Sequence, residues 1–138
     1  MINPYELQNS LSKKVEKGWG HEIWMVNNEK YCGKILHFDS KAKFSMHYHL
    51  NKDETWFVNN GRFLLKWINT ETAEMVSQEL TEGMTWHNPP LQPHQLICME
   101  PNSSITEVST ADSVEDNYRI APGDSQKSLP QIEEENAD

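Results

Sequence analysis

The stretch HYHLNKDETWFVNNG, residues 47–61, contains the pattern that decides the fold. Residues 54–58, ETWFV, bounded by a polar turn and by Asn-Gly, are expected to form a short β-strand. His47 and His49 lie two apart on the strand before it, so their imidazoles are expected on one face. Two buried imidazoles are costly without a common partner, and a divalent metal ion is the simplest one. Asn60-Gly61 closes the stretch and predicts a two-residue hairpin turn, because both residues tolerate positive φ.

Most of the remaining chain is also typical of short strands. We expect strands at residues 22–26, 31–38, 44–49, 54–58, 62–68, 74–80, 83–87, 94–99 and 104–109. Turn signals recur at intervals of roughly 8–12 residues, which indicates an antiparallel sandwich or barrel. No strand–helix–strand alternation and no glycine-rich phosphate loop occurs, which argues against a nucleotide-binding fold. The expected class is therefore all-β.

The two ends of the chain differ from this pattern. An N-terminal helix is indicated by capping at Asn3 and Pro4, by an apolar stripe of Leu7, Leu11 and Val15, and by a stop at Gly18. Residues beyond the last strand become acidic. We therefore predict a helical extension over 1–17, a barrel over 18–124, and a disordered acidic tail over 125–138.

Composition limits the class of function. The 138 residues carry a net charge of -9, which argues against nucleic-acid binding through clustered basic residues. No apolar run approaches the roughly 18 residues that a membrane span needs, and the N-terminus lacks the features of a secretory signal. Cys32 and Cys98 match no metal or disulfide spacing, so both are expected as free thiols. A cytoplasmic protein without a membrane or nucleic-acid partner is expected.

Two further residues extend the histidine pair to a full set of metal ligands. Glu54 begins the strand that follows the polar turn at 50–53, and a hairpin there would return it beside His47 and His49. His94 begins a later strand. Three imidazoles and one carboxylate suit Zn, Mn, Fe, Ni or Co and disfavour Cu(I). Four protein ligands leave a position open for a small molecule on an octahedral ion, as catalysis requires.

At these residues the chain resembles the cupin superfamily. The spacing His47-x-His49-x4-Glu54-x6-Gly61 matches the first cupin motif. The second motif is matched at Gly83, Pro89 and His94. Departures occur at three positions, where the motifs have Gly, Gly and Asn and this chain has Lys41, Leu91 and Cys98. The resemblance implies a jelly-roll barrel and one divalent metal ion bound by His47, His49, Glu54 and His94.

The resemblance narrows towards the cupin part of type II mannose-6-phosphate isomerases. It rests on Trp19-Gly20, on Tyr31 opening a strand, and on the segments 107–108 and 115–120. This implies a small-molecule substrate, a sugar or sugar phosphate, and aldose–ketose isomerisation as the reaction. Cupins of this size often pair through their outer sheets, which suggests a homodimer whose interface would include Trp19, Trp24 and the N-terminal helix, all expected to be exposed; their alternative role is to cover one face of the barrel. An iron-dependent dioxygenase and a non-catalytic sugar-binding cupin remain alternatives, so whether the protein is an enzyme stays open.

Isomerisation requires a base and, for a phosphorylated sugar, a cationic group. The candidate bases are Glu22, Lys34, His37 and His87, with Lys34 on the strand face opposite His37. Arg119 is the candidate cation, and its alternative role is an ion pair with Glu115 or Asp116. We take Lys34 and Arg119 as the catalytic candidates. Two further residues share faces with the ligands: Trp56 as core or sugar platform, and Cys98 as a core thiol.

Overall fold

The structure is a computed structural model that describes residues 10–126. Its strands are β1 (Lys13–Lys17), β2 (Gly20–Asn27), β3 (Cys32–Phe38), β4 (Met46–Tyr48), β5 (Glu54–Asn60), β6 (Arg62–Asn69), β7 (Glu74–Thr81), β8 (Thr85–Asn88), β9 (His94–Cys98), β10 (Ser103–Ser109) and β11 (Tyr118–Ala121). Each strand expected from the sequence has a counterpart. Within residues 10–126 the chain forms no helix, and hence none long and apolar enough to cross a bilayer.

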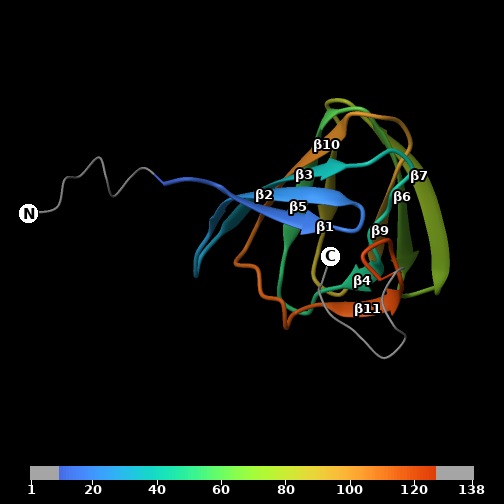
Figure 1. Ribbon diagram of the computed structural model, residues 1–138. Coiled ribbons are helices and arrows are strands. Elements are labelled where there is room, and N and C mark those ends of the chain that lie inside the picture. The colour runs from blue at the N-terminus through green and yellow to red at the C-terminus, as the bar shows by residue number, and fades with distance from the viewer. Residues whose placement is uncertain (1–9, 127–138) are drawn as a thin grey trace, which may run out of the picture.

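The strands form two antiparallel sheets that face each other (Figure 1). The six-stranded sheet has the order β1-β2-β3-β10-β5-β8, and the five-stranded sheet has the order β11-β4-β9-β6-β7. β1, β2 and β3 pair in chain order, as do β6 and β7, but other neighbours are distant in sequence, such as β10 between β3 and β5. This arrangement confirms the predicted all-β jelly roll.

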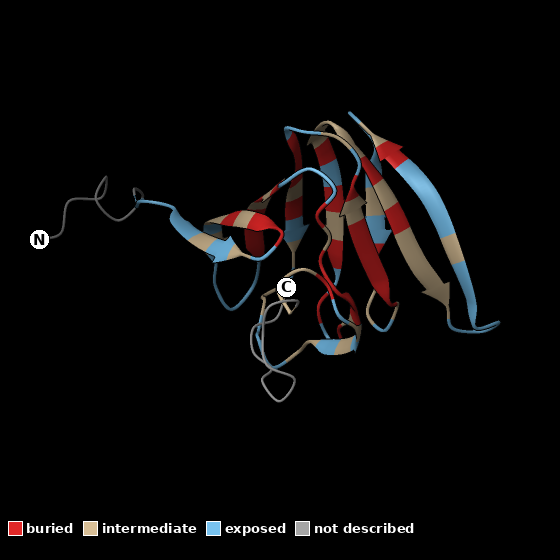
Figure 2. Ribbon diagram, turned by 45° about the vertical axis from the view of Figure 1, so that its right-hand side comes forward, coloured by how far each residue is buried: buried red, intermediate tan, exposed pale blue. Residues whose placement is uncertain are grey.

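Side chains alternate between the interior and the surface along the central strands (Figure 2). In β5, Trp56 and Val58 are buried while Phe57 between them is exposed. In β3, Lys34 and Leu36 point inwards. The enclosed core is built from aromatic and aliphatic side chains of both sheets. One face of most strands therefore lines the space between the sheets, and this space contains the candidate site.

The predicted N-terminal helix is contradicted at its C-terminal end. Residues 13–17 form β1 and pair with β2, with Val15 opposite Glu22. Pairing with the neighbouring β2 satisfies the backbone of this segment, which overrides the weak apolar stripe of the predicted helix. Residues 1–9 and 127–138, which hold most of the predicted extension and tail, lie outside the described residues.

Two predicted hairpins are instead crossings between the sheets. Gly61, at a φ of 88°, connects β5 of the six-stranded sheet to β6 of the five-stranded sheet. The turn at 50–53 likewise connects β4 to β5 across the sheets. The turn predicted at Gly61 is present, but the partner of each strand is set by pairing with strands distant in sequence.

The departures from the cupin motifs preserve the backbone shape. Lys41 and Leu91, which stand where the motifs have Gly, adopt φ values of 68° and 74°. This left-handed conformation is strained for residues with a Cβ and is the reason for Gly at such positions. The turns therefore persist despite the substitutions.

Trp19 was predicted as an exposed interface residue, and that prediction is wrong. Its ring is fully buried and stacks on Phe38 at a centroid distance of 4.5 Å. Trp24 is half-buried, with the Lys13 ammonium group 5.3 Å from its ring centroid. The predicted homodimer stays a prediction.

Substitution of Gly61 tests the crossing. A Cβ at Gly61 would collide with the Ser103 side chain, whereas one at Gly83 would meet nothing within 4 Å. Because the two φ values are nearly equal, at 88° and 86°, Gly83→Ala is the matched control for backbone strain. We expect Gly83→Ala to lower the free energy of unfolding by about 1–2 kcal/mol and Gly61→Ala to lower it further. Urea denaturation measures both, and equal losses would contradict the crowding at Gly61.

Candidate metal centre

Three buried histidines meet between the sheets. His47 on β4 lies directly opposite His94 on β9, and His49 follows the end of β4. Their candidate ligand atoms all lie within 4.8 Å of one another. The i, i+2 spacing and the later His94 therefore converge as the sequence predicted.

Each histidine is oriented by a backbone carbonyl that faces its Nδ1. The carbonyl oxygens belong to Ser45 for His47 (2.8 Å), Asp116 for His49 (2.6 Å) and Gln92 for His94 (2.9 Å). A carbonyl can only accept, so each Nδ1 carries the hydrogen. The Nε2 atom of each ring is then the nitrogen available to a metal, in the arrangement typical of metal-ligating histidines.

The surroundings favour the neutral form of His47 and His49. Burial lowers the pKa of His47 well below its usual value, and the neighbouring His94 and His49 lower it further. Burial also lowers the pKa of His49, although Glu54 opposes this effect. Neutral imidazoles are the form that binds metal ions.

Glu54 lies at the edge of this histidine group. Its Oε2 is 3.1 Å from His94 Nε2 and accepts a hydrogen bond of 3.1 Å from Asn88 Nδ2. Its Oε1 is 3.2 Å from the Lys52 ammonium group. Burial opposes ionisation of Glu54, but Lys52 and His94 outweigh it and hold the pKa of Glu54 well below its usual range. The fourth predicted ligand is thus a carboxylate shared between a lysine and a histidine.

One buried atom in this arrangement has no proper partner. His94 Nε2 forms no hydrogen bond, although it faces the Glu54 carboxylate. With the hydrogen on Nδ1, both facing atoms carry lone pairs and repel unless a proton or a cation lies between them. The residues therefore fit a metal ion, which supports the predicted divalent cofactor.

The cavity at this site is small. It has a volume of about 10 Å³, room for roughly one water molecule, and His47, His49 and Glu54 contribute to its lining. Trp56 also lines it, but its ring is 1% exposed and belongs to the core. Trp56 therefore closes the cavity and presents no open face to a sugar. Cys98 is fully buried and is a core residue, as expected.

The four candidate bases separate into two inner and two outer groups. Lys34 and Glu22 line the cavity, with Lys34 Nζ 3.5 Å from Glu22 Oε1. Burial lowers the pKa of Lys34, but Glu107 and Glu22 outweigh it and the net shift is upwards, so Lys34 is held as an ammonium ion. His37 stacks on His21 at the outer face, and His87 is exposed and paired with Asp53.

Arg119 lies on β11, directly opposite His47 in the strand register. Its side chain is half-buried and does not contribute to the lining of the cavity. Directly opposite residues of an antiparallel ladder share a face, so Arg119 lies on the same sheet face as His47, and its Nε is buried.

Sequence reasoning missed Lys52, which it assigned to a polar turn. Its ammonium group is buried and lies 3.2 Å from Glu54, 2.8 Å from Glu107 and 3.3 Å from Asp112. The period of two through Glu54 and Trp56, extended back by two residues, would have placed Lys52 on the inner face. Burial lowers the pKa of Lys52, but the carboxylates outweigh it and hold the pKa well above its usual value.

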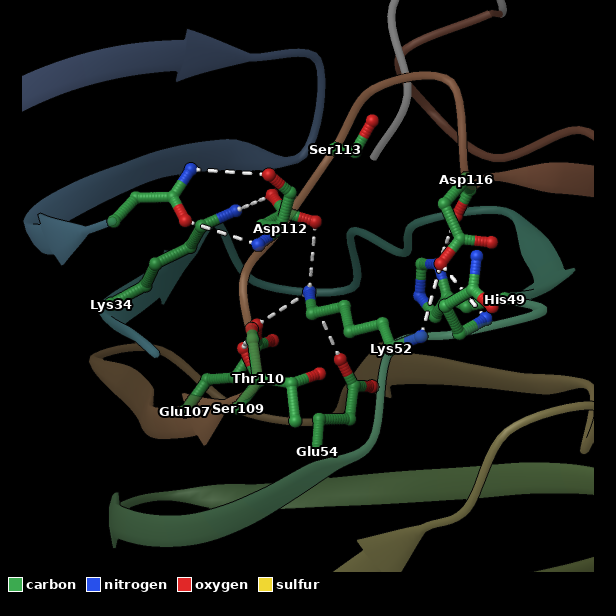
Figure 3. Close-up of polar contacts among 12 residues, drawn as sticks. Lys34, His49, Lys52, Glu54, Glu107, Ser109, Thr110, Asp112, Ser113 and Asp116 are labelled. Carbon is green, nitrogen blue, oxygen red and sulfur yellow. Dashed lines mark hydrogen bonds and ion pairs between the residues drawn. The ribbon is translucent and has the colours of Figure 1, made fainter. Parts of the chain in front are cut away.

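The segment between β10 and β11, residues 110–117, lies across this end of the site, and we call it the strap (Figure 3). The Asp116 carboxylate accepts hydrogen bonds from the backbone amides of Leu50 (2.6 Å), Asn51 (3.0 Å) and Lys52 (3.0 Å). Its carbonyl orients His49. Asp116 therefore fixes the connection between β4 and β5, which carries one histidine ligand and Lys52.

Comparisons with known proteins establish the fold. No family model matches the chain, and no curated protein matches its sequence. Oxalate decarboxylase from Bacillus subtilis at pH 4.6 matches with a TM-score of 0.70 and 15% identity over 79% of this chain and 30% of that chain. A tryptophan-to-tyrosine variant of that enzyme matches with 0.70 and 16% over the same shares, 79% and 30%.

A third match comes from work on the Mn(II) centers of the same Bacillus subtilis enzyme, with a TM-score of 0.69 and 14% identity, again over 79% of this chain and 30% of that chain. The chain thus spans under a third of the decarboxylase chains that it matches. At these identities the likeness shows the fold alone. The fold agrees with the cupin jelly roll that the sequence motifs imply.

The Asp112 carboxylate supports a prediction about pH. Burial would raise the pKa of Asp112, but Lys52 and Lys34 outweigh it and lower the pKa from 3.8 to about 2. A lowered pKa in the folded state stabilises the fold above the unfolded value, and this contribution is lost as the pH falls from 3.8 to about 2. We expect Asp112→Asn to lower the free energy of unfolding by about 2 kcal/mol at pH 7, from the size of the shift.

The measurement is urea denaturation of the wild type and Asp112→Asn across that pH range. The difference between them should vanish at the acidic end. Glu79→Gln, which removes an exposed carboxylate paired with Arg62, is the control and should have little effect. A difference that stays constant down to the lowest pH would contradict an ionised Asp112 in the folded state.

Proposed function

We propose that the protein binds one divalent metal ion through His47, His49 and His94, with Glu54 as the fourth ligand. The observation that carries this proposal is the contact between His94 Nε2 and the Glu54 carboxylate, which face each other at 3.1 Å with no hydrogen-bond partner for Nε2. A cation bound there would be coordinated by both groups. The Nδ1 hydrogen bonds of the three rings support the same assignment, because they leave Nε2 free for a metal.

The charge of the interior also supports a cation. Three buried carboxylates and one partly buried carboxylate lie around the site and face two buried ammonium groups, those of Lys34 and Lys52. The carboxylates belong to Glu22, Glu54, Glu107 and Asp112. Burial and, after it, the nearby Glu54 raise the pKa of Glu107, while Lys52 and Lys34 oppose this shift. A divalent ion at the histidines would balance the excess of carboxylates over ammonium groups.

The ligand set of imidazoles and one carboxylate is compatible with Zn, Mn, Fe, Ni or Co. Mn(II) is the first ion to test, because the similarly folded oxalate decarboxylase has Mn(II) centers. When bound, such an ion supplies a Lewis acid to a small molecule in the cavity. The chain's own residues hold the ion and exclude water, and Asn88 orients the Glu54 carboxylate through its hydrogen bond.

The proposed substrate rests on the sequence resemblance more than on the geometry of the site. Resemblance to type II mannose-6-phosphate isomerases supports aldose–ketose isomerisation of a sugar or sugar phosphate. Lys34 and Glu22 are the candidate proton-transferring groups that line the cavity. Both cavity lysines are already paired with carboxylates, so a phosphate group would need another partner. The geometry therefore favours the metal-binding part of this proposal over its phosphate-binding part.

Replacement of one ligand tests the metal centre. We expect His49→Ala to lower Mn(II) or Zn(II) affinity by more than the roughly 10–100-fold that loss of an outer partner costs. The loss of stability in metal-free protein should be modest, because the strands close the barrel without the ion. Metal analysis and calorimetric titration measure this, with the exposed His87→Ala as control. Equal affinity of both variants would contradict the site, and unfolding on metal removal would show a structural ion.

Solvent proton exchange tests the isomerase proposal. Metal-loaded protein with mannose-6-phosphate or fructose-6-phosphate in deuterated water should incorporate deuterium at C2, because isomerisation moves a proton between C1 and C2. Glu22→Gln, which keeps the shape of a candidate base, should slow the exchange. No exchange across a panel of sugars and sugar phosphates would overturn isomerisation and leave binding as the function. Oxygen uptake with Fe(II) would instead favour a dioxygenase.

A further inference from the structure

Asp112 is a carboxylate inserted between two buried lysines (Figure 3). Its Oδ2 lies 2.6 Å from Lys34 Nζ and its Oδ1 lies 3.3 Å from Lys52 Nζ, so each oxygen faces one ammonium group. The lysine side chains are 5% and 6% exposed, and that of Asp112 is 16% exposed. Both lysines also line the cavity beside the histidines.

The two halves of this contact are anchored differently. Lys34 lies within β3, which pairs with β2 on one side and β10 on the other. The backbone of Lys52 is held by Asp116. Asp112 lies on the strap, outside both sheets, and its backbone is held by the Asn27 side chain at 3.0 and 3.3 Å. Lys34 thus belongs to the barrel wall, whereas Lys52 lies on the connection between β4 and β5 and Asp112 lies on the strap.

We propose that Lys34 and Lys52 form a binding site for a small monocarboxylate ligand, and that Asp112 fills this site when the ligand is absent. Binding then requires the strap to withdraw the Asp112 side chain. The site lies beside the proposed metal centre, but the pair of lysines exists without the ion. This inference therefore goes beyond the metal-binding function and does not depend on it.

The surrounding charge selects the ligand class. Lys34 and Lys52 are also near the carboxylates of Glu22, Glu54 and Glu107. Exchange of one carboxylate for another leaves the buried charge unchanged. A phosphate dianion would add a negative charge beside these three acids, which is unfavourable in a buried site. Formate and acetate carry the same carboxylate group as the Asp112 side chain that they would replace, so they are the probes of matching shape and charge.

Chemical rescue of an emptied site tests the proposal. Asp112→Ala removes the carboxylate and leaves space between the lysines, whereas Asp112→Asn fills that space with a neutral group of the same shape. We expect formate and acetate to raise the thermal midpoint of Asp112→Ala in a saturable manner, by several degrees more than that of Asp112→Asn. Chloride at equal ionic strength controls for salt, and phosphate should give no saturable rise. Equal responses of the two variants would overturn the proposal.

A second measurement uses the wild type and does not depend on the folding of a variant. If formate displaces Asp112, the amide hydrogens that fix the strap should exchange faster in its presence. These are the amides of Asp112, bonded to Asn27, and of Thr110, bonded to the Asp53 carbonyl. Unchanged exchange at saturating formate would overturn the displacement.

Both measurements are made on protein freed of metal by a chelating resin and repeated with Mn(II). Carboxylate rescue without metal binding would leave this inference standing and remove the proposed function. Metal binding without rescue would do the opposite.

Discussion

The ion pairs of the buried Lys52 ammonium group are the interaction on which the arrangement of charges inside this barrel depends. This group joins carboxylates from three separate segments, Glu54 from β5, Glu107 from β10 and Asp112 from the strap. Without this cation, three acids would face each other in a space from which water is almost excluded. Removal of one partner from such a buried group leaves uncompensated charge, and this costs far more than the loss of a surface ion pair. Lys52 thereby also fixes the carboxylate that faces His94.

The inner face of the barrel could be predicted largely from the sequence. The period of two placed His47 and His49 together, and the strand order brought His94 beside them. The same two-residue period places Lys52 on the inner face with Glu54, but Lys52 was assigned to the polar turn at 50–53 and its burial was not predicted. What the period could not supply is the partner of each strand. Gly61 was correctly assigned to a turn, yet β5 and β6 belong to different sheets.

The contacts that the strap makes could not be predicted from any local sequence pattern. Asp112 and Asp116 are acids in a polar connecting segment, which ordinarily indicates a solvated loop. In the structure they reach partners 60 to 78 residues away, since Asp112 contacts Lys52 and Lys34, and Asp116 contacts the 50–52 amides. Such pairs have no signature in spacing, because their chemistry is set only when the chain has folded. The N-terminal helix failed for a related reason, since pairing with β2 overrode the local signals.

The hydrogen bond from His49 to the Asp116 carbonyl has a consequence for the two ends of the strap. One short segment holds the orientation of His49, a proposed metal ligand, and also supplies the acid that lies between the lysines. Thermodynamic linkage is reciprocal, so any molecule that shifts the position of this segment must change the affinity for the ion by the same factor by which the ion changes the affinity for that molecule. The strap therefore connects the proposed carboxylate site, at Asp112, to the proposed metal site, at the Asp116 carbonyl.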